Sequence, residues 1–342
     1  MEHLHLYPIK KKTVSGPGER VCAELLENVY STSTPACYGT TVTALPFSMH
    51  ELGRALKCIR KKKSADHDGI MAEMFIHGSC DLRLCLLRLL NDIVTSGSIP
   101  NNWYATYFCL LHKGGDPNDA NIWRPTAILS ITYTIMARII FHRIAPRIEL
   151  CQSEDQFGFR QFRSCIHALF VAEVMMSRCI EFSVPLWIAS VDLKKAFDRI
   201  QHIVLFDVLR QQGIGEGSLS LLQLLYKHQY GVIGDHSFLI SRGVRQGDVL
   251  SPILFNAALE HAMCKWKKRL VGKGFALDEN KTSPRLTNIR YADDLLLFAQ
   301  SEQELIMMIE TLIEVLEEYG LELNTSKTKI LSTVNNVDGQ TQ

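Results

Sequence analysis

The chain has 342 residues, of which 46% are hydrophobic, so it can bury a substantial core and form two subdomains. Its formal net charge of +1 excludes a strong overall field for a polyanion, although local basic runs leave nucleic-acid contact open. The ten cysteines contain no CxxC pair, which favours reduced thiols over a disulfide framework. The sequence has no membrane-length apolar run and no signal peptide, so we expect an intracellular protein, cytoplasmic or nuclear, with no membrane contact.

The first 47 residues carry little hydrophobic patterning, and we expect a poorly ordered N-terminal extension over 1–47. Loop-type segments at Ser15–Gly18 and Ser31–Pro35 flank one short predicted helix, Glu19–Val29. We expect no chemistry from this extension. At Ser48 a capping box with Glu51 begins a clear amphipathic helix, so the patterned part of the chain starts there.

Residues 48–184 combine helical patterns with two buried strand patterns. After the helix at Ser48, further predicted helices cover 71–77, 81–95, 133–150 and 165–180. The predicted strands are 104–111 and 126–130, separated by a turn-rich loop. A compact loop, Gln156–Arg160, contains two aromatic residues and one cation.

Residues 185–333 follow the order strand, helices, hairpin, helix, strand. The predicted strands are 185–193, 237–241, 286–290, 295–299 and 327–331, and the predicted helices are 202–212, 218–230, 251–269 and 302–319. Without the short strand 237–241, this is a β-α-β-β-α-β pattern, which is typical of a ferredoxin-like sheet. The middle hairpin of such a sheet lies beside its first strand. The pattern therefore places Asp192, at the end of the first strand, next to Asp293 in the hairpin.

The hairpin turn carries two adjacent carboxylates, Asp293 and Asp294. Two ionised carboxylates about 4 Å apart repel by roughly 4 kcal/mol at an effective dielectric near 20. A divalent cation removes this cost, whereas an inert, solvated Asp-Asp turn is the plainer interpretation. Together with Asp192 the pair supplies three carboxylates on adjacent strands. That set is what two-metal phosphoryl transfer requires.

Three segments resemble motifs A, B and C of reverse transcriptases, above all those of non-LTR (LINE-type) retrotransposons and their group II intron relatives. These segments are Val191–Asp198, Gly243–Pro252 and Tyr291–Asp294. Trp123–Pro125, Gly158–Ser164 and Gly320–Lys329 resemble the fingers strand, the motif after it and motif D. The resemblance covers about residues 50–333. It implies an α+β right-hand polymerase with fingers in 48–184 and 213–247, a palm in 185–333 and a disordered tail, 334–342.

The resemblance also implies a catalytic and metal-binding set. Asp192, Asp293 and Asp294 would hold two Mg²⁺ ions, or Mn²⁺ in their place, with help from the backbone carbonyl of Leu193. Lys327 resembles the lysine that protonates the leaving pyrophosphate. The plainer interpretation of Lys327 is a surface lysine near a turn.

Further residues resemble the family's substrate contacts. The implied deoxynucleotide-binding set is Lys113, Arg124, Phe197, Gln246 and Gly247, and the implied nucleic-acid contacts are Arg160, Arg163 and Tyr291. Phe197 resembles the aromatic side chain that excludes a ribose 2′-hydroxyl by steric clash. On the plainer interpretation Phe197 is core packing, the cations are solvated and Gln246–Gly247 is an ordinary loop.

The resemblance implies an RNA-directed DNA polymerase that uses an RNA template, a DNA primer and deoxynucleoside triphosphates. We expect the thumb to be absent, because little sequence follows motif D. A catalytically silent, nucleic-acid-binding remnant of the same fold therefore stays open. A metal-dependent cyclase-like palm is disfavoured, since it has no use for Gln246–Gly247. An RNA-templated RNA polymerase is disfavoured by Phe197 and Ala292.

Overall fold

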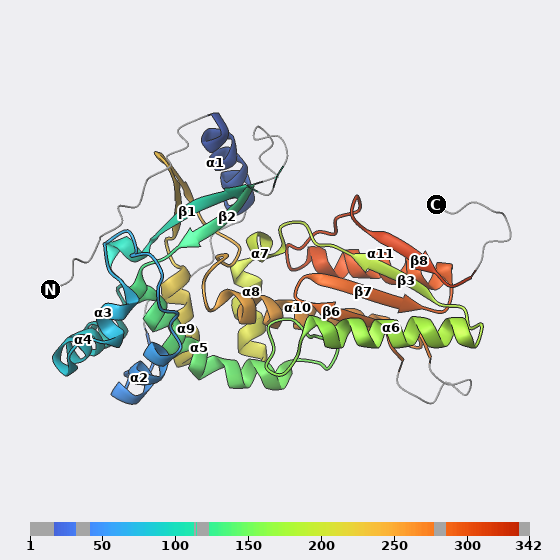
Figure 1. Ribbon diagram of the computed structural model, residues 1–342, viewed down its shortest axis with the longest axis horizontal. Coiled ribbons are helices and arrows are strands. Elements are labelled where there is room, and N and C mark those ends of the chain that lie inside the picture. Colours follow the sequence, from blue (N-terminus) through green and yellow to red (C-terminus); the bar gives the residue numbers. More distant parts are fainter. Residues whose placement is uncertain (1–16, 32–41, 113, 115–122, 277–284, 335–342) are drawn as a thin grey trace.

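The computed structural model describes residues 17–31, 42–112, 114, 123–276 and 285–334 (Figure 1). The predicted mixture of helices and strands is present. In chain order the elements are α1 (Pro17–Tyr30), α2 (Met49–Lys57), α3 (Ala72–Ile76), α4 (Cys80–Ser96), the 3₁₀ turn η1 (Asn101–Trp103), β1 (Ala105–His112), β2 (Trp123–Ile128), α5 (Ile131–Cys151), α6 (Cys165–Glu181), β3 (Trp187–Val191), α7 (Ala196–Arg199), α8 (His202–Gln211), α9 (Glu216–Tyr226), β4 (Tyr230–Ile233), β5 (His236–Leu239), α10 (Ser251–Arg269), β6 (Asn288–Tyr291), β7 (Asp294–Ala299), α11 (Glu302–Glu317) and β8 (Lys329–Ser332).

The strands form two four-stranded sheets that lie toward opposite ends of the long axis (Figure 1). The first sheet has the order β2-β1-β4-β5, in which β1 pairs antiparallel with β2 and parallel with β4. The second has the order β6-β7-β3-β8, and β3 pairs antiparallel with both of its neighbours. The hairpin β6–β7 thus lies beside β3, as the sequence pattern predicted. No helix in the described ranges is long and apolar enough to cross a membrane.

The predicted C-terminal end of one helix is wrong. The sequence pattern extended it from Ser218 to Tyr230, but α9 stops at Tyr226 and Tyr230 begins β4. The chain turns at His228, whose φ of 54° is left-handed and incompatible with a continuing helix. β4 pairs in parallel with β1, more than a hundred residues earlier. This distant pairing, rather than local periodicity, determines that Tyr230 is extended.

Local signals at the helix ends match the structure. The Ser48 side chain accepts a hydrogen bond from the Glu51 amide at 3.3 Å, and the Glu51 carboxylate accepts one from the Ser48 amide at 2.9 Å. This capping box satisfies two backbone N–H groups at the start of α2. Pro252 stands in the first turn of α10, where a missing N–H costs nothing.

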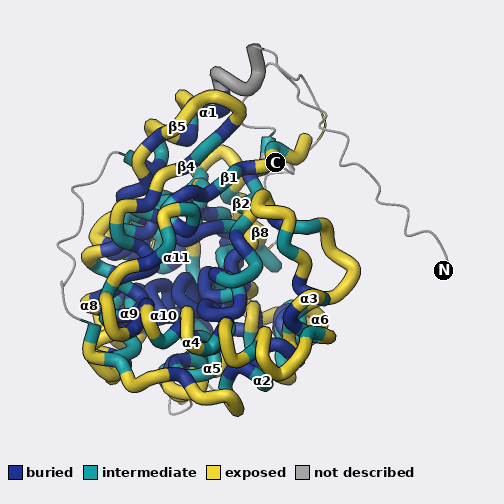
Figure 2. The backbone as a smooth tube through the Cα atoms, turned by 90° about the vertical axis from the view of Figure 1, so that its left-hand side faces the viewer, coloured by how far each residue is buried: buried dark blue, intermediate teal, exposed yellow. Residues whose placement is uncertain are grey.

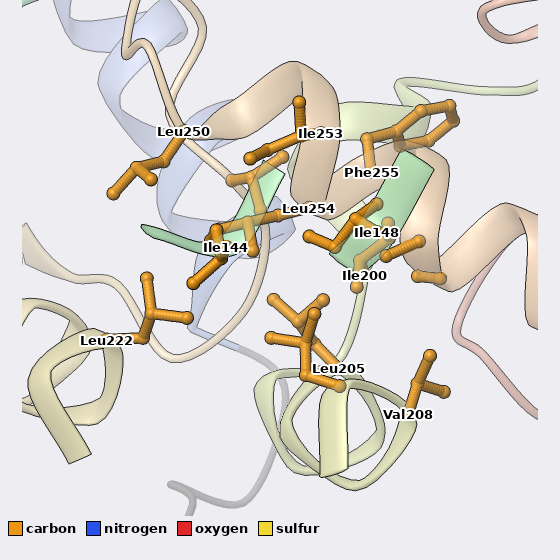
Figure 3. Packing of buried hydrophobic residues seen from close by; sticks show 14 of the residues in the cluster. Ile144, Ile148, Ile200, Leu205, Val208, Leu222, Leu250, Ile253, Leu254 and Phe255 are labelled. Atoms are coloured by element: carbon orange, nitrogen blue, oxygen red, sulfur yellow. The ribbon is translucent and has the colours of Figure 1, made fainter. Parts of the chain in front are cut away.

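The largest core lies among α5, α8, α9, α10 and α11, and Figure 2 shows buried backbone gathered inside a shell of exposed residues. Figure 3 shows aliphatic side chains from four helices pointing toward one another: Ile144 and Ile148 of α5, Leu205 and Val208 of α8, Leu222 of α9 and Leu254 of α10. Full burial of each such side chain contributes about 1.5–3 kcal/mol. The core therefore holds the long helix α10 firmly behind the second sheet.

A buried ionic network ties β6 to α10 and to the loop after α5. The Arg290 guanidinium, on β6, lies 2.6 Å from Asp155 and 2.6 Å from Glu260. Lys267 also pairs with Asp155. Burial alone would raise the pKa of Asp155, but the charges of Arg290 and Lys267 outweigh it and lower that pKa from 3.8 to about 2. The carboxylate form of Asp155 therefore stabilises the fold.

We predict a pH-dependent loss of stability that involves Asp155. Its folded-state pKa lies below the unfolded value, so its contribution is present above about pH 4 and disappears as the pH falls through about 2. The shift from 3.8 to about 2 corresponds to about 2 kcal/mol of unfolding free energy. Urea unfolding between pH 5 and about pH 2 measures this loss. Asp155→Asn should flatten the profile, whereas Asp235→Asn, which removes an exposed carboxylate, should leave the slope unchanged.

Candidate active site

The second sheet brings three predicted carboxylates to one end. Val191, the last residue of β3, pairs with Leu295 of β7, so Asp192 and Asp294 leave the paired region side by side. Asp293 lies in the turn between Tyr291 and Asp294, which pair with each other. Asp192 and Asp293 both line one cavity of about 1000 Å³. Residues about a hundred positions apart in sequence therefore meet at one site.

Neighbouring charged groups at this end of the second sheet change the pKa of Asp294. Burial raises the pKa of Asp294, and the negative charge of Asp192 raises it further. Lys327 opposes this effect, and its ammonium lies 3.6 Å from an Asp192 carboxylate oxygen. Lys327 is 69% exposed, so solvent weakens the pair. The negative charge of Asp192 near Asp294 is thus only partly compensated by Lys327.

Oxygen ligands with unbalanced negative charge suit a hard divalent cation. Within the described ranges, no three His, Cys, Asp or Glu side chains are already grouped closely enough to hold one metal ion. The donor chemistry fits Mg²⁺ nonetheless, because a cation would relieve the repulsion that raises the pKa of Asp294. Leu193, whose carbonyl was predicted to assist, is buried and lines the same cavity.

The turn that carries Asp293 is held by Gln156, a residue to which the sequence analysis gave no role. Ala292 has a left-handed φ of 59°, which costs a non-glycine residue about 1–2 kcal/mol. The buried Gln156 side chain accepts a hydrogen bond from the Ala292 amide at 3.1 Å and donates one to its carbonyl at 3.3 Å. Gly158 lies against the same turn, where a Cβ would approach the Ala292 nitrogen to 2.1 Å. The compact loop therefore clamps the acidic turn.

Asn324 is a second residue that the sequence analysis did not single out. Its backbone amide donates to the Asp192 carbonyl at 2.8 Å, and its side-chain amide donates to the Asp192 carboxylate at 2.8 Å. These two bonds fix both the backbone and the side chain of Asp192. The only advance signal was its position between Gly320 and Lys327, in the segment that resembles motif D.

Phe197 forms part of an aromatic wall of the cavity. Its ring stacks on Phe255 with centroids 4.5 Å apart and meets Phe159 edge-on at 6.1 Å. Phe197 is half-buried and lines the cavity together with Phe159. One face of the ring thus packs on the core helix α10, while the residue also borders the open volume.

The Gln246–Gly247 turn packs on β2. The Gln246 carbonyl accepts a hydrogen bond from the Ala127 amide at 2.9 Å. Gly247 has a φ of +110°, and a Cβ there would lie 3.0 Å from the Ala127 carbonyl oxygen. The Gln246 side chain donates to Asp198 at 3.2 and 3.3 Å. Both residues line the same cavity as Asp192 and Asp293.

The remaining predicted site residues that the structure describes do not line the cavity. Arg160 pairs with Glu149 at 2.7 Å and donates to the Ser153 carbonyl at 2.6 Å, so it is engaged within its own loop. Arg163 pairs with Glu154. Tyr291 is 39% exposed at the end of β6, and the Arg124 backbone pairs with Leu111. Lys113 lies outside the described residues.

Helix α1 contributes a wall that the sequence analysis did not foresee. Four of its residues line the cavity: Cys22, Leu25, Leu26 and Val29. The helix itself was predicted over Glu19–Val29, and that prediction is confirmed. The weak hydrophobic patterning of this segment gave no indication that the helix would border the acidic site.

Comparison with known proteins now identifies the class. Residues 111–339 match the family described as "Reverse transcriptase (RNA-dependent DNA polymerase)", which is more than half of the chain. The chain therefore belongs to that family. The matched range contains Asp192, Asp293 and Asp294.

Its relatives include proteins of mobile elements. The chain is 29% identical over 262 residues to the "Transposon TX1 uncharacterized 149 kDa protein" of Xenopus laevis, covering 75% of this chain and 20% of that protein. It is 27% identical to the Pol polyprotein from the retrotransposable element R2 of Popillia japonica, covering 85% of this chain and 40% of that protein. The chain thus spans less than half the length of these relatives.

A solved structure has a similar fold. Apo telomerase from Candida tropicalis, truncated from the C-terminal domain, superimposes with a TM-score of 0.50. The match covers 71% of this chain and 53% of that protein, at 12% identity. At this identity the likeness supports a shared fold only.

We predict opposite pKa changes at Asp294 for two substitutions. Asp192→Asn removes a neighbouring negative charge, so it should lower the pKa of Asp294. Lys327→Met removes the opposing positive charge and should raise it. Carboxyl ¹³C NMR titrations measure both changes, with Asp235→Asn as the distant control. Shifts of the same sign in the two variants would contradict the described arrangement.

Proposed function

We propose that this chain carries the core of an RNA-directed DNA polymerase, which copies an RNA template onto a DNA primer from deoxynucleoside triphosphates. The observation that carries the proposal is the meeting of Asp192, Asp293 and Asp294 at one end of one sheet, where Asp192 and Asp293 line a large cavity. Membership of the reverse transcriptase family supports the same activity. Because the chain spans less than half of its relatives, activity of this chain alone is part of the proposal.

Asp192, Asp293, Asp294 and the Leu193 carbonyl would hold two Mg²⁺ ions, with Mn²⁺ as an alternative. Such ions activate the primer hydroxyl and stabilise charge on the phosphorus and the leaving oxygen. Asn324 orients the Asp192 carboxylate through its 2.8 Å hydrogen bond. Gln156 holds the turn that presents Asp293. Lys327, exposed and 3.6 Å from Asp192, would give a proton to the leaving pyrophosphate.

The cavity walls suit a nucleotide. Phe197 would exclude a ribose 2′-hydroxyl, while Gln246 and Gly247 would pack against the new base pair. Arg124 and Lys113 would bind the triphosphate, because charge-assisted bonds to phosphate are stronger than neutral ones. Arg160, Arg163 and Tyr291 would contact the nucleic acid. Arg160 and Arg163 would first have to leave their present acidic partners.

We also infer the finer architecture of such an enzyme. The strand order β6-β7-β3-β8 supports a ferredoxin-like palm within residues 185–333. Fingers would comprise 48–184 with 213–247.

Primer extension tests the proposed activity. With an RNA template, a DNA primer, deoxynucleotides and Mg²⁺, we expect the chain to extend the primer. Asp293→Asn should reduce the rate by about 10²-fold or more, because it removes charge that would bind the metal ions. Asp235→Asn is the matched control and should retain the wild-type rate. Primer-template binding without extension in either Mg²⁺ or Mn²⁺ would favour a catalytically silent remnant.

Sugar selection tests the role of Phe197. Phe197→Ala should raise ribonucleotide incorporation relative to deoxynucleotide incorporation by about 10–100-fold, because it removes the steric clash with the 2′-hydroxyl. Single-nucleotide kcat/KM values measure the ratio. Phe206→Leu, a core substitution away from the cavity, should lower stability without altering the ratio. Equal loss of both activities in Phe197→Ala would identify Phe197 as core packing.

A further inference from the structure

Helix α1 is anchored by its last carbonyl groups. The Tyr30 carbonyl accepts hydrogen bonds from the Ser241 amide at 3.0 Å and the Ser241 hydroxyl at 2.7 Å. The Arg242 guanidinium donates to the Val29 carbonyl and, at 3.3 Å, to the Asn28 carbonyl. These bonds satisfy carbonyls that a helix end leaves without intrahelical partners. Because Ser241 and Arg242 lead directly into the Gln246 loop, the end of α1 is fixed to that loop.

The Tyr30 side chain extends this anchor toward the cavity. The residue has no exposed surface, and its ring stacks against Phe108 and Phe238 with centroids 5.9 and 6.1 Å away. Its hydroxyl donates a hydrogen bond to the buried Asp198 carboxylate. Burial, together with the charge of Asp198, raises the pKa of Tyr30 well above its usual value. The hydroxyl is therefore protonated and can act as a donor at neutral pH.

Asp198 links Tyr30 to a predicted substrate residue. The same carboxylate accepts hydrogen bonds from the Gln246 side chain at 3.2 and 3.3 Å. The backbone of Asp198 is also packed tightly against Gly243, where a Cβ would lie 2.6 Å from the Asp198 carbonyl oxygen. The Asp198 backbone thus has little room to move. A change in the side-chain hydrogen bonds of Asp198 would therefore change the position of the Gln246 side chain.

The apolar face of α1 borders the same volume. Cys22, Leu25, Leu26 and Val29 line the cavity with Phe197 and Gln246. The positive charge of Lys195, which adjoins the segment carrying Phe197, partly offsets the effect of burial on the pKa of the Cys22 thiol. This places Cys22 near that segment. Helix α1 therefore contributes to the cavity wall as well as to the hydrogen bonds behind it.

We propose that α1 is a working part of the nucleotide pocket and that Tyr30 is a positioning residue, which holds Gln246 through Asp198. The proposal rests on the proposed function and deepens it. It assigns to the N-terminal segment a role in binding the incoming nucleotide. Tyr30 itself touches no substrate; it acts through the orientation of the Gln246 amide.

Tyr30→Phe tests the proposal with little change in packing, because only the hydroxyl is removed. Without that donor the Asp198 carboxylate can rotate and the Gln246 loop loosens. We expect faster amide hydrogen exchange in residues 244–250 of the full chain without substrate. We also expect the KM for deoxynucleotide to rise about tenfold, with kcat within about twofold. In a Gln246→Ala background, Tyr30→Phe should raise KM no further, because the two side chains act in one chain of hydrogen bonds.

Tyr319→Phe is the matched control. Tyr319 is also buried, and its hydroxyl pairs with His261 at 2.6 Å, away from the cavity lining. This variant should leave both the exchange of 244–250 and the KM unchanged. Asp198→Asn, which removes the charge that holds the Gln246 amide, provides a second variant and should also accelerate exchange.

Amide hydrogen exchange and primer extension together distinguish the positioning role of Tyr30 from the proposed polymerase activity. Accelerated exchange in Tyr30→Phe, in a chain whose wild type does not extend primers, would support positioning and overturn the proposed activity. Unchanged exchange in both Tyr30→Phe and Asp198→Asn would overturn positioning, whether or not the wild type extends primers. Additive KM effects in the double variant would likewise overturn the link through Asp198.

Discussion

Repulsion between carboxylates at one end of a sheet is the constraint on which the site depends. The register of β3 with β7 places Asp192 beside Asp294, and their mutual repulsion helps to raise the pKa of Asp294. Strand pairing keeps the two acids together, since separating them would break several backbone hydrogen bonds and expose the core behind. The fold thus sets up an electrostatic cost that a bound cation can relieve.

Holding the acids also requires support for the turn between them. Ala292 is left-handed, and Gln156 bonds both its amide and its carbonyl. The loop that carries Gln156 is tied to β6 by Asp155, which pairs with Arg290. Arg290 pairs in turn with Glu260 on α10, the most buried helix. The strain of one residue is thereby balanced by an ionic network and a large hydrophobic core.

The sequence was sufficient to predict the acids but not what holds them. Strand and helix order alone placed the hairpin beside β3, because that order permits few topologies. Gln156, Asn324 and Tyr30 were not assigned roles, since each acts through a contact more than a hundred residues away. Arg160 shows the reverse case. The family resemblance implied a nucleic-acid contact for Arg160, but only the structure could show that Glu149 already pairs with it.

The charged groups around the cavity divide into a buried, paired set and an exposed set. Arg245 is fully buried against the Tyr133 and Tyr226 rings and pairs with Asp248, directly behind Gln246. Arg290 is equally buried behind the acidic turn. Removing one partner of such a buried pair costs about 3–5 kcal/mol, so the two loops are held rigidly. Lys327, by contrast, is exposed and weakly paired. In the proposed polymerase, the rigid loops would hold metal ions and a base pair in place, and the exposed Lys327 would move with the leaving pyrophosphate as its proton donor.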